Sequence, residues 1–445
     1  MYISKIKLHN IKCFEDATIN LEDANAIFRG CLILGGNGMG KTTILRLIAM
    51  SLSGKSSASG LLDDMPGGVI RNKEKEGYVL LMLKSDDGKQ HFSIKTTFGR
   101  ENGGANIVTE QATSIPNENQ INPNQETSSN SAGFPWEEIF VCGYGAARGI
   151  RGDGQYDEYA VPDAVYSLFA LESGYLQNPE VSLRRTKDLI SDELFQKLLN
   201  WVDSVLMLPK GSVTLKKGAG IFVKDPWGIS RPIGTIADGY HATLSMICDL
   251  FGWALFYDKE IFEKGLSGIV MIDEIDQHLH LVWQRKIIGN LIKVFSKIQF
   301  IMTTHSPLIA GNAGKLFDAG NGLKLFYTGR KDEKAEISEI EENLGELGCD
   351  QILSSEAFGH ISNLNINQQV EKLLKEASIL AAKDQRTPEE NTKYDNFKKK
   401  LKELMFPEGK TLIERVTERE FYKEMEHKID EFNKILRGGN SSDKN

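Results

Sequence analysis

The sequence lacks several features that define other classes of protein. It has no run of about 18 apolar residues, so we expect no helix that spans a membrane. Its first residues, MYISKIKLHNIKCF, alternate apolar and polar side chains and contain no apolar segment of the signal-peptide kind. The five cysteines form no C-x-x-C pair, which indicates buried free thiols in a reducing compartment. We therefore expect a cytoplasmic protein without a membrane partner.

A strong positive charge and a heptad repeat are also missing. The formal net charge is −8, which argues against a protein coated with nucleic acid but allows a local basic patch. No sustained heptads occur, so no long coiled coil is expected. The 445 residues, 40% hydrophobic and 26% charged, are typical of a globular protein with one large domain and an appendage, or with two to three ordinary domains.

The clearest motif present is LILGGNGMGKTT at residues 32–43, which satisfies G-x-x-x-x-G-K-[ST] between a strand-like and a helix-like apolar run. In such a loop, backbone N–H groups and the helix dipole face phosphate oxygens. The lysine reaches the β- and γ-phosphates, and the next hydroxyl ligates Mg²⁺. The motif therefore predicts a site for ATP and Mg²⁺, with Thr42 as a metal ligand. The expected phosphate-binding residues are Gly35, Asn37, Gly38, Met39, Gly40, Lys41, Thr42 and Thr43.

Two further apolar runs end in polar residues. GIVMIDE ends in Asp273 and Glu274, and IQFIMTTHSP contains His305. The carboxyl ends of parallel strands meet at the edge of a sheet where ligands bind. Asp273 is predicted to hold the Mg²⁺ shell, and Glu274 to orient and deprotonate the attacking water. The order of the three motifs further predicts that His305 senses the γ-phosphate.

These three motifs in this order resemble the ATP-binding-cassette ATPases of the SMC, RecF and OLD branch. The opening ISKIKLHNIKCFEDATINL resembles the start of such heads, and IDEIDQHLHLVWQRKI resembles their Walker B and D-loop segment, with Ile275 where many relatives have proline. The resemblance covers roughly residues 1–330. It implies an α/β fold: a P-loop head with an N-terminal mixed β lobe and a helical signature lobe.

The segment IADGYHATLSM, residues 236–246, lies where these ATPases carry a Leu-Ser-x-Gly signature that opens a helix. In the family this helix start contacts the γ-phosphate held by another subunit. The resemblance thus implies a homodimer or higher oligomer, with Asp238 and Gly239 at the nucleotide. Ala237 replaces the serine, and a lost hydrogen bond to a charged group costs ~1.5–3 kcal/mol. The alternative is an ordinary helix N-terminus that contacts no second subunit.

The other segments suggest a domain organisation. Within the head, residues 77–98 predict a hairpin, and 99–135, rich in Asn, Gln, Ser and Gly, predict an exposed mobile loop. Residues 160–260 are expected to form the helical signature lobe. Residues 331–445 alternate charges with regular Leu, Ile and Phe, which predicts a helical extension for a partner or for self-association.

Two basic groups are ambiguous. Arg148 and Arg151 lie in the glycine-rich GYGAARGIRG and are expected in solvent, although a contact with phosphate or an acidic partner remains open. The run Lys398–Lys400 is typical of a solvated helix face, with a nucleic-acid patch as the alternative.

The combination of GYGAAR, SLFALESGYLQNPE, DGYHATL and CDQILSSEAFG resembles the PtuA family of ATPases from Septu and retron-linked antiphage systems. This resemblance implies an ATPase that controls an associated HNH nuclease subunit, so that nucleic acid is an indirect partner. No Asp-x-Asp follows residue 306, as a Toprim nuclease would need, and the histidines form no HNH motif. Nuclease activity is therefore not expected in this chain. The alternatives are a RecF/SMC-like repair ATPase that clamps DNA and an ATP-dependent scaffold with little turnover.

Overall fold

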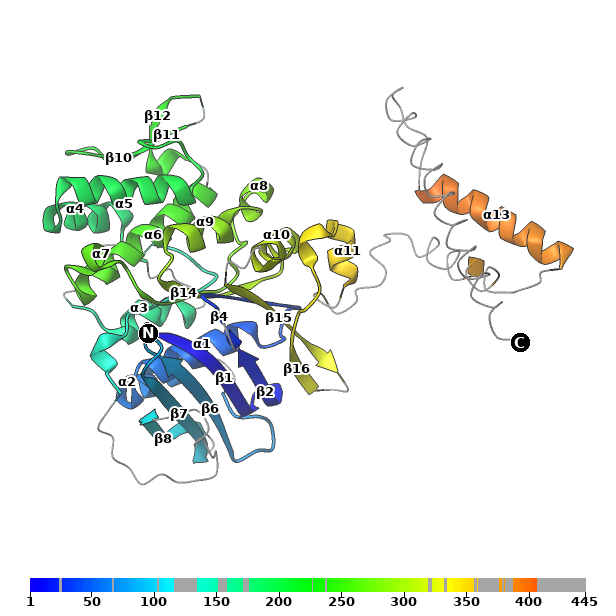
Figure 1. Ribbon diagram of the computed structural model, residues 1–445, viewed down its shortest axis with the longest axis horizontal. Helices are drawn as coiled ribbons and strands as arrows, with labels where there is room; N and C mark the ends of the chain where they lie inside the picture. Colours follow the sequence, from blue (N-terminus) through cyan, green and yellow to red (C-terminus); the bar gives the residue numbers. More distant parts are fainter. Residues whose placement is uncertain are drawn as a thin grey trace. The chain divides into compact units, whose positions relative to one another are not determined.

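The computed structural model divides the chain into two compact units, Met1–Ile361 and Ser362–Asn445. The first unit carries all the motifs (Figure 1). The residues that the structure describes are 1–23, 26–65, 68–101, 104–115, 134–150, 158–170, 176–225, 227–236, 238–318, 322–331, 334–355, 358, 376–377, 380 and 387–405.

An 11-stranded sheet in the order β8-β7-β6-β1-β2-β16-β15-β5-β14-β13-β9 forms the centre of the first unit. The expected head boundary at residue 330 falls inside β15, because β15 and β16 join this sheet. In chain order the strands are β1 (Tyr2–Ile11), β2 (Phe14–Asn20), β5 (Gly30–Gly35), β6 (Glu76–Lys84), β7 (His91–Glu101), β8 (Gly104–Ile115), β9 (Val141–Tyr144), β13 (Gly268–Ile272), β14 (Ile298–Thr304), β15 (Leu323–Lys331) and β16 (Lys334–Glu339). A separate pair joins β3 (Glu22–Asp23) and β4 (Ala26–Ile27).

Helices cover the sheet and build the lobe beside it. The α-helices of the first unit are α1 (Lys41–Leu52), α2 (Lys55–Asp63), α3 (Val161–Val165), α4 (Pro179–Leu189), α5 (Asp192–Val205), α6 (Asp238–Tyr257), α7 (Ile261–Lys264), α8 (Leu281–Gln284), α9 (Ile287–Val294), α10 (Pro307–Asp318) and α11 (Cys349–Ser354). Single 3-10 turns are η2 (Trp136–Glu138), η3 (Tyr166–Leu168), η4 (Ile233–Thr235) and η5 (Leu344–Glu346).

The parallel half of the sheet, β15-β5-β14-β13-β9, separates two hydrophobic cores. Leu32 and Leu34 of β5 belong to one core, and Cys31 and Ile33 belong to the other. Successive side chains of a strand point to opposite faces, and here α1 covers one face while α6, α9 and α10 cover the other. Burial on both faces explains why these strands read as continuous apolar runs.

The antiparallel half confirms the predicted hairpin, since β6 pairs with β7 from Glu76↔Gly99 to Lys84↔His91. The predicted mobile loop over 99–135 is wrong for its first part, because β7 continues to Glu101 and β8 pairs along it. β8 is an edge strand, and backbone pairing to one neighbour tolerates its polar composition. Residues 116–133 lie outside the described residues.

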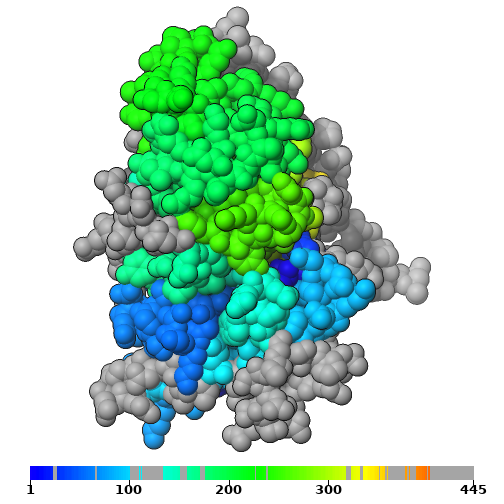
Figure 2. All heavy atoms as spheres, turned by 90° about the vertical axis from the view of Figure 1, so that its left-hand side faces the viewer, coloured from blue at the N-terminus to red at the C-terminus, as the bar shows by residue number. Residues whose placement is uncertain are grey.

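The signature lobe differs from the expected helical one. Figure 2 shows residues 179–232, in green, at one end of the first unit. Within the expected span 160–260, α3 instead packs against β9 and α1. Between α5 and α6 it contains a three-stranded sheet of β10 (Val213–Lys216), β11 (Gly220–Lys224) and β12 (Ser230–Pro232). The strands β10 and β11 pair from Val213↔Val223 to Lys216↔Gly220 around a turn that contains Gly218, a hairpin that the sequence reasoning missed.

In the second unit, α13 (Pro388–Met405) is helical, as expected, and it includes Lys398–Lys400. Most of the expected extension lies outside the described residues. In the described part of the chain, no helix is long and apolar enough to cross a membrane. Nor does that part contain a long coiled coil. All five cysteines are free, although Cys349 is exposed rather than buried as expected.

Candidate nucleotide-binding site

Three adjacent parallel strands bring the predicted motifs to one edge of the sheet. β14 lies between β5 and β13, with Thr304 beside Leu34 and Met302 beside Ile272. The loop of residues 36–40 follows β5, His305 follows β14, and Asp273 and Glu274 follow β13. The residues expected to bind phosphate, metal and water therefore meet at the carboxyl ends of neighbouring strands.

Glycine is required at both ends of the phosphate loop. A Cβ on Gly35 would lie 2.3 Å from the Thr328 carbonyl oxygen, and one on Gly40 would lie 2.6 Å from the Phe14 ring. Thr328 also donates its hydroxyl to the Met39 carbonyl at 2.7 Å, which fixes the loop to β15. No side chain caps α1, so its first N–H groups are available to an anion. Asn37 and Gly38 are exposed at the tip, while Met39 and Thr43 lie deeper.

Lys41 is buried at the centre of the site. Its Nζ donates to the Gly35 and Gly36 carbonyls, each at 2.9 Å, and lies 2.8 Å from His305 Nε2. Burial lowers the pKa of Lys41, and the nearby carboxylates, led by Asp273, oppose that change. The ammonium is thus held against the loop and beside the end of β14.

Thr42 and Asp273 form the candidate magnesium ligands. Thr42 Oγ1 donates to Asp273 Oδ2 at 2.7 Å, and Thr303 Oγ1 donates to Asp273 Oδ1 at 2.5 Å. The described residues contain no cluster of three or more His, Cys, Asp or Glu side chains suited to a metal ion. Nucleotide-bound Mg²⁺ takes one or two protein oxygens, and phosphates and water complete its shell. A hydroxyl beside a carboxylate fits such a shell.

Glu274 and His305 face one another across this edge. His305 Nε2 lies 3.8 Å from Glu274 Oε1, and the Glu274 side chain is 36% exposed, so water can reach its carboxylate. Burial, and next the Lys41 ammonium, lower the pKa of His305. Its imidazole is therefore neutral near pH 7, with Nε2 accepting from Lys41 and the proton on Nδ1.

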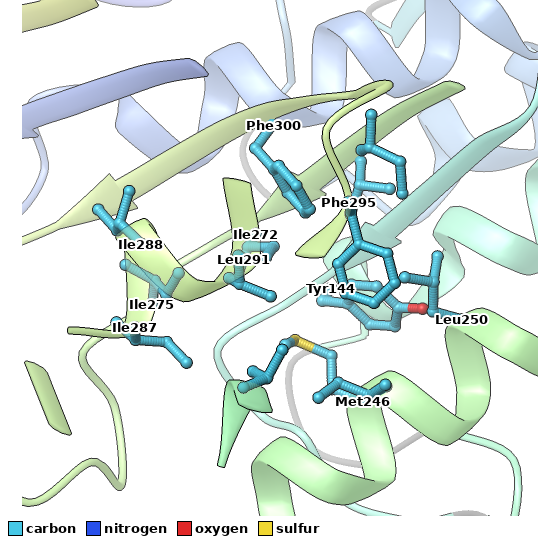
Figure 3. Close-up of a cluster of buried hydrophobic side chains, with 14 of the residues drawn as sticks. Tyr144, Met246, Leu250, Ile272, Ile275, Ile287, Ile288, Leu291, Phe295 and Phe300 are labelled. Atoms are coloured by element: carbon cyan, nitrogen blue, oxygen red, sulfur yellow. The ribbon is translucent and has the colours of Figure 1, made fainter. Parts of the chain in front are cut away.

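The turn after Glu274 is fixed from both sides. Ile275 is buried and lies beside Ile287, Ile288 and Leu291 of α9 (Figure 3). The D-loop, residues 276–280, follows. Thr304 Oγ1 donates to Asp276 Oδ1 at 2.5 Å, which ties the D-loop to the end of β14.

Thr303 is a site residue that sequence reasoning missed. Its hydroxyl donates to Asp273 and accepts the N–H of Glu274 at 2.8 Å, so it contacts both acidic residues. The available signal was the pair of hydroxyl residues, Thr303 and Thr304, that closes an apolar run directly before His305.

The position of Arg148 also differs from the prediction. We expected it in solvent, but it is 7% exposed, and its Nη2 donates to the Asp273 and Glu274 carbonyls, each at 2.9 Å. The turn after β9 directs it inward, because β9 pairs with β13 and so ends beside these two acids. Arg151 lies outside the described residues.

The predicted signature residues lie against the D-loop rather than the phosphate loop. A Cβ on Gly239 would lie 2.4 Å from the His278 carbonyl oxygen, and the Tyr240 ring contacts Trp283 with centroids 3.9 Å apart. The side chain of Asp238 and all of Ala237 lie outside the described residues. Within the described part, no contact joins Gly239 to the phosphate loop.

Comparison with solved structures returned SMC heads. The SMC head domain from Thermotoga maritima has a TM-score of 0.41 and 13% identity, covering 77% of this chain and 100% of that chain. An Smc head bound to the C-winged helix domain of ScpA has a TM-score of 0.45 and 15% identity, covering 78% and 100%.

Comparison with families and curated proteins returned ATPases. An "AAA domain" model matches residues 5–138, and an "AAA domain, putative AbiEii toxin, Type IV TA system" model matches residues 243–311. Septu protein PtuA of Bacillus mycoides (strain KBAB4) is 25% identical over 317 residues, 69% of this chain and 38% of that protein. "Retron Ec83 probable ATPase" of Escherichia coli is 32% identical over 140 residues, 30% of this chain and 26% of that protein.

"Retron Vc95 probable ATPase" of Vibrio cholerae serotype O1 biovar El Tor is 60% identical over 84 residues, 18% of this chain and 16% of that protein. The chain thus spans well under half the length of these three curated relatives. The AAA-domain matches and these relatives show that the chain is similar to Septu PtuA and to the probable ATPases of the two retrons, and the three motifs lie together at one sheet edge.

Proposed function

We propose that this chain binds and hydrolyses ATP with Mg²⁺, pairs head to head, and controls an associated HNH nuclease in antiphage defence. One observation carries the ATPase part: Thr42 of the phosphate loop lies 2.7 Å from Asp273, beside Glu274 and His305. Similarity to PtuA and the retron ATPases supports the defence role. The nuclease partner rests on that similarity alone.

Each residue has a stated role in the proposed reaction. Lys41 and the loop amides of residues 37–43 bind phosphate oxygens. Mg²⁺, held by Thr42 and through its shell by Asp273, would neutralise charge on the phosphates. Glu274 orients water and accepts its proton, and the neutral His305 steadies the γ-phosphate end of the substrate. This assignment of roles follows from burial: Lys41 and Asp273 are buried, whereas water can reach the Glu274 carboxylate.

A second copy would complete the site through α6. Gly239 packs on the D-loop, so the helix start that the resemblance assigns to the contact with a second subunit lies beside the D-loop. Leu281 and Val282, directly after the D-loop, are 61% and 55% exposed. Large exposed apolar side chains at this position support association between heads.

The test compares Glu274→Gln with Lys41→Ala. Glu274→Gln removes the base but keeps the shape, so we expect ATP turnover to fall by about 10²–10⁴-fold while ATP-dependent dimers accumulate. Lys41→Ala should lose ATP binding and therefore remain monomeric. Turnover by phosphate release and mass by light scattering measure both outcomes. Wild-type turnover in Glu274→Gln would overturn the assignment.

The partner is tested separately by co-expression with the protein encoded by the neighbouring gene. Co-purification with an HNH protein, and DNA cleavage that changes when Glu274→Gln is used, would support the defence role. If the chain is a stable, active ATPase and no HNH protein co-purifies with it, only the ATPase part of the proposal would remain.

Direct DNA binding, as in a RecF-like clamp, is favoured by one observation. On β1, Lys5 and Lys7 alternate with buried residues, and on β7 Lys95 Nζ lies 4.6 Å from the Tyr78 ring centroid. Cations interleaved with an aromatic ring suit a phosphate backbone. Salt-dependent binding of duplex DNA by the chain alone, lost in Lys5→Glu/Lys7→Glu, would favour this function over the nuclease-control function.

A further inference from the structure

The loop after β9 contributes a buried cation to the candidate site. We propose that Arg148 is a positioning residue for ATP hydrolysis, one that holds the backbone of Asp273 and Glu274 so that the Glu274 carboxylate is aimed correctly. This inference rests on the proposed ATPase function of the same site.

Among the described residues, the side-chain hydrogen bonds of Arg148 are both made by Nη2. Nη2 donates to two consecutive carbonyls, those of Asp273 and Glu274, each at 2.9 Å. Nε is buried and has no hydrogen-bond partner among the described residues. Hydrogen bonds from a charged donor are about twice as strong as neutral ones, so this single nitrogen strongly constrains both peptide groups.

Those peptide groups need a constraint. Glu274 has φ +46°, in the left-handed region that a residue with a side chain rarely adopts. Such a conformation is unfavourable and persists only where neighbours hold it. Thr303, from β14, accepts the Glu274 N–H on one side. Arg148, from the β9 side, donates to the Glu274 carbonyl on the other.

The charge of Arg148 also has an electrostatic role. Asp273, Glu274 and Asp276 all interact electrostatically with Arg148, and the same three act on Lys41. Arg148 is thus a second cation beside three carboxylates. Burial lowers the pKa of Arg148 to about 10, so its side chain remains charged at neutral pH.

The loop after β9 turns tightly before Arg148, and this turn directs the Arg148 side chain into the site. A Cβ on Gly145 would lie 2.1 Å from the Ser167 carbonyl oxygen, and the Gly145 N–H donates to Ser167 Oγ at 2.7 Å. The chain therefore turns tightly against η3 before Arg148.

The experiment measures ATP turnover and nucleotide affinity in Arg148→Ala and Arg148→Lys. If Arg148 positions Glu274, Arg148→Ala should lower kcat by about 10–100-fold, as expected for losing a charge-assisted hydrogen bond, and change ATP affinity less than about threefold. Added guanidinium should restore part of the kcat of Arg148→Ala, and added ammonium should not. In the Glu274→Gln background, Arg148→Ala should lower kcat no further.

Wild-type kcat in Arg148→Ala, or equal losses of kcat and ATP affinity without guanidinium rescue, would overturn the inference and leave the ATPase function standing. If Arg148→Ala does not fold, Arg148→Lys decides, because an ammonium cannot reproduce the guanidinium geometry. A reduced kcat with unchanged KM supports positioning, and a wild-type kcat refutes it. No ATP hydrolysis by the wild-type chain would instead remove the proposed function itself.

Discussion

The phosphate-loop edge and the start of α6 are two halves of one expected site, but they are built differently. At the edge, Lys41, Thr42 and His305 all make hydrogen bonds to other site residues. At the start of α6, Gly239 lies against the D-loop and Tyr240 contacts Trp283, and neither has a described contact with the phosphate loop. The first half brings its residues together within one chain, whereas the second, under the proposed pairing of heads, would act on a nucleotide held by another copy.

This difference changes how the glycines are interpreted. Gly35 and Gly40 shape a loop whose amides face a ligand. Gly239 is required by the carbonyl of His278 in the same chain, whether or not a second head binds. A signature glycine is therefore weaker evidence for a dimer than a phosphate-loop glycine is for a nucleotide.

Among Thr303→Ala, Gly239→Ala and Asp249→Asn, the largest effect should come from Thr303→Ala, which acts on the phosphate-loop edge. Thr303→Ala removes a hydroxyl that contacts both Asp273 and the Glu274 N–H. A hydrogen bond to a charged group is worth about 1.5–3 kcal/mol, so kcat should fall by about 10–100-fold. Thr303→Ser keeps the hydroxyl and is the matched control, with turnover near wild type. Equal rates for the Ala and Ser variants would show that the hydroxyl has no role.

The motifs of the phosphate-loop edge could be predicted because their chemistry is local. Lys41 and Thr42 follow from a contiguous pattern, and Asp273 and His305 from apolar runs that end in polar residues. Their convergence needs only that the strands be parallel neighbours, as β5, β14 and β13 are.

The remaining features depend on contacts distant in sequence. Arg148 is buried because β9 pairs with β13, and nothing in GYGAAR indicates that pairing. Likewise, β8 forms because β7 offers a free edge, although its own residues are typical of a loop. The partner of Gly239 is the D-loop, some forty residues further along the chain, so its packing could not be seen in the local sequence.

An intermediate effect is expected from Gly239→Ala. The added Cβ would lie 2.4 Å from the His278 carbonyl oxygen, so α6 and the D-loop must separate. Overpacking of this kind costs about 1–3 kcal/mol. We expect a lower melting temperature and loss of ATP-dependent dimers in the Glu274→Gln background, with the ATP affinity of the monomer retained.

The matched control for this variant is Gly234→Ala. A Cβ on Gly234 meets nothing within 4 Å, so both melting temperature and dimerisation should stay at wild-type values. Loss of ATP affinity in the Gly239→Ala monomer would instead mean that the start of α6 and the phosphate-loop edge do not act independently within one chain.

The smallest effect concerns Asp249, which lies in α6 away from the phosphate loop. Burial raises the pKa of Asp249 from 3.8 to about 7, against hydrogen bonds from the Gln177 N–H at 2.7 Å and from the side chains of Tyr144 and Trp253. Between these two pH values the folded state holds a proton that the unfolded state has released. Stability therefore falls as pH rises through this window, and the whole penalty is present above about pH 7.

Asp249→Asn has no proton to lose, so it should raise the melting temperature by a few degrees at pH 8, and by less at pH 5, while ATP turnover is unchanged.

Asp203→Asn is the contrasting variant, because the Asp203 carboxylate accepts the N–H groups of Gly211, Ser212 and Val213. An amide would turn a donor toward those donors and destabilise the lobe at every pH. A melting-temperature gain for Asp249→Asn that is the same at pH 5 and pH 8 would exclude ionisation as its cause. A parallel fall in turnover would instead mean that the interior of α6 affects the phosphate-loop edge within a single chain.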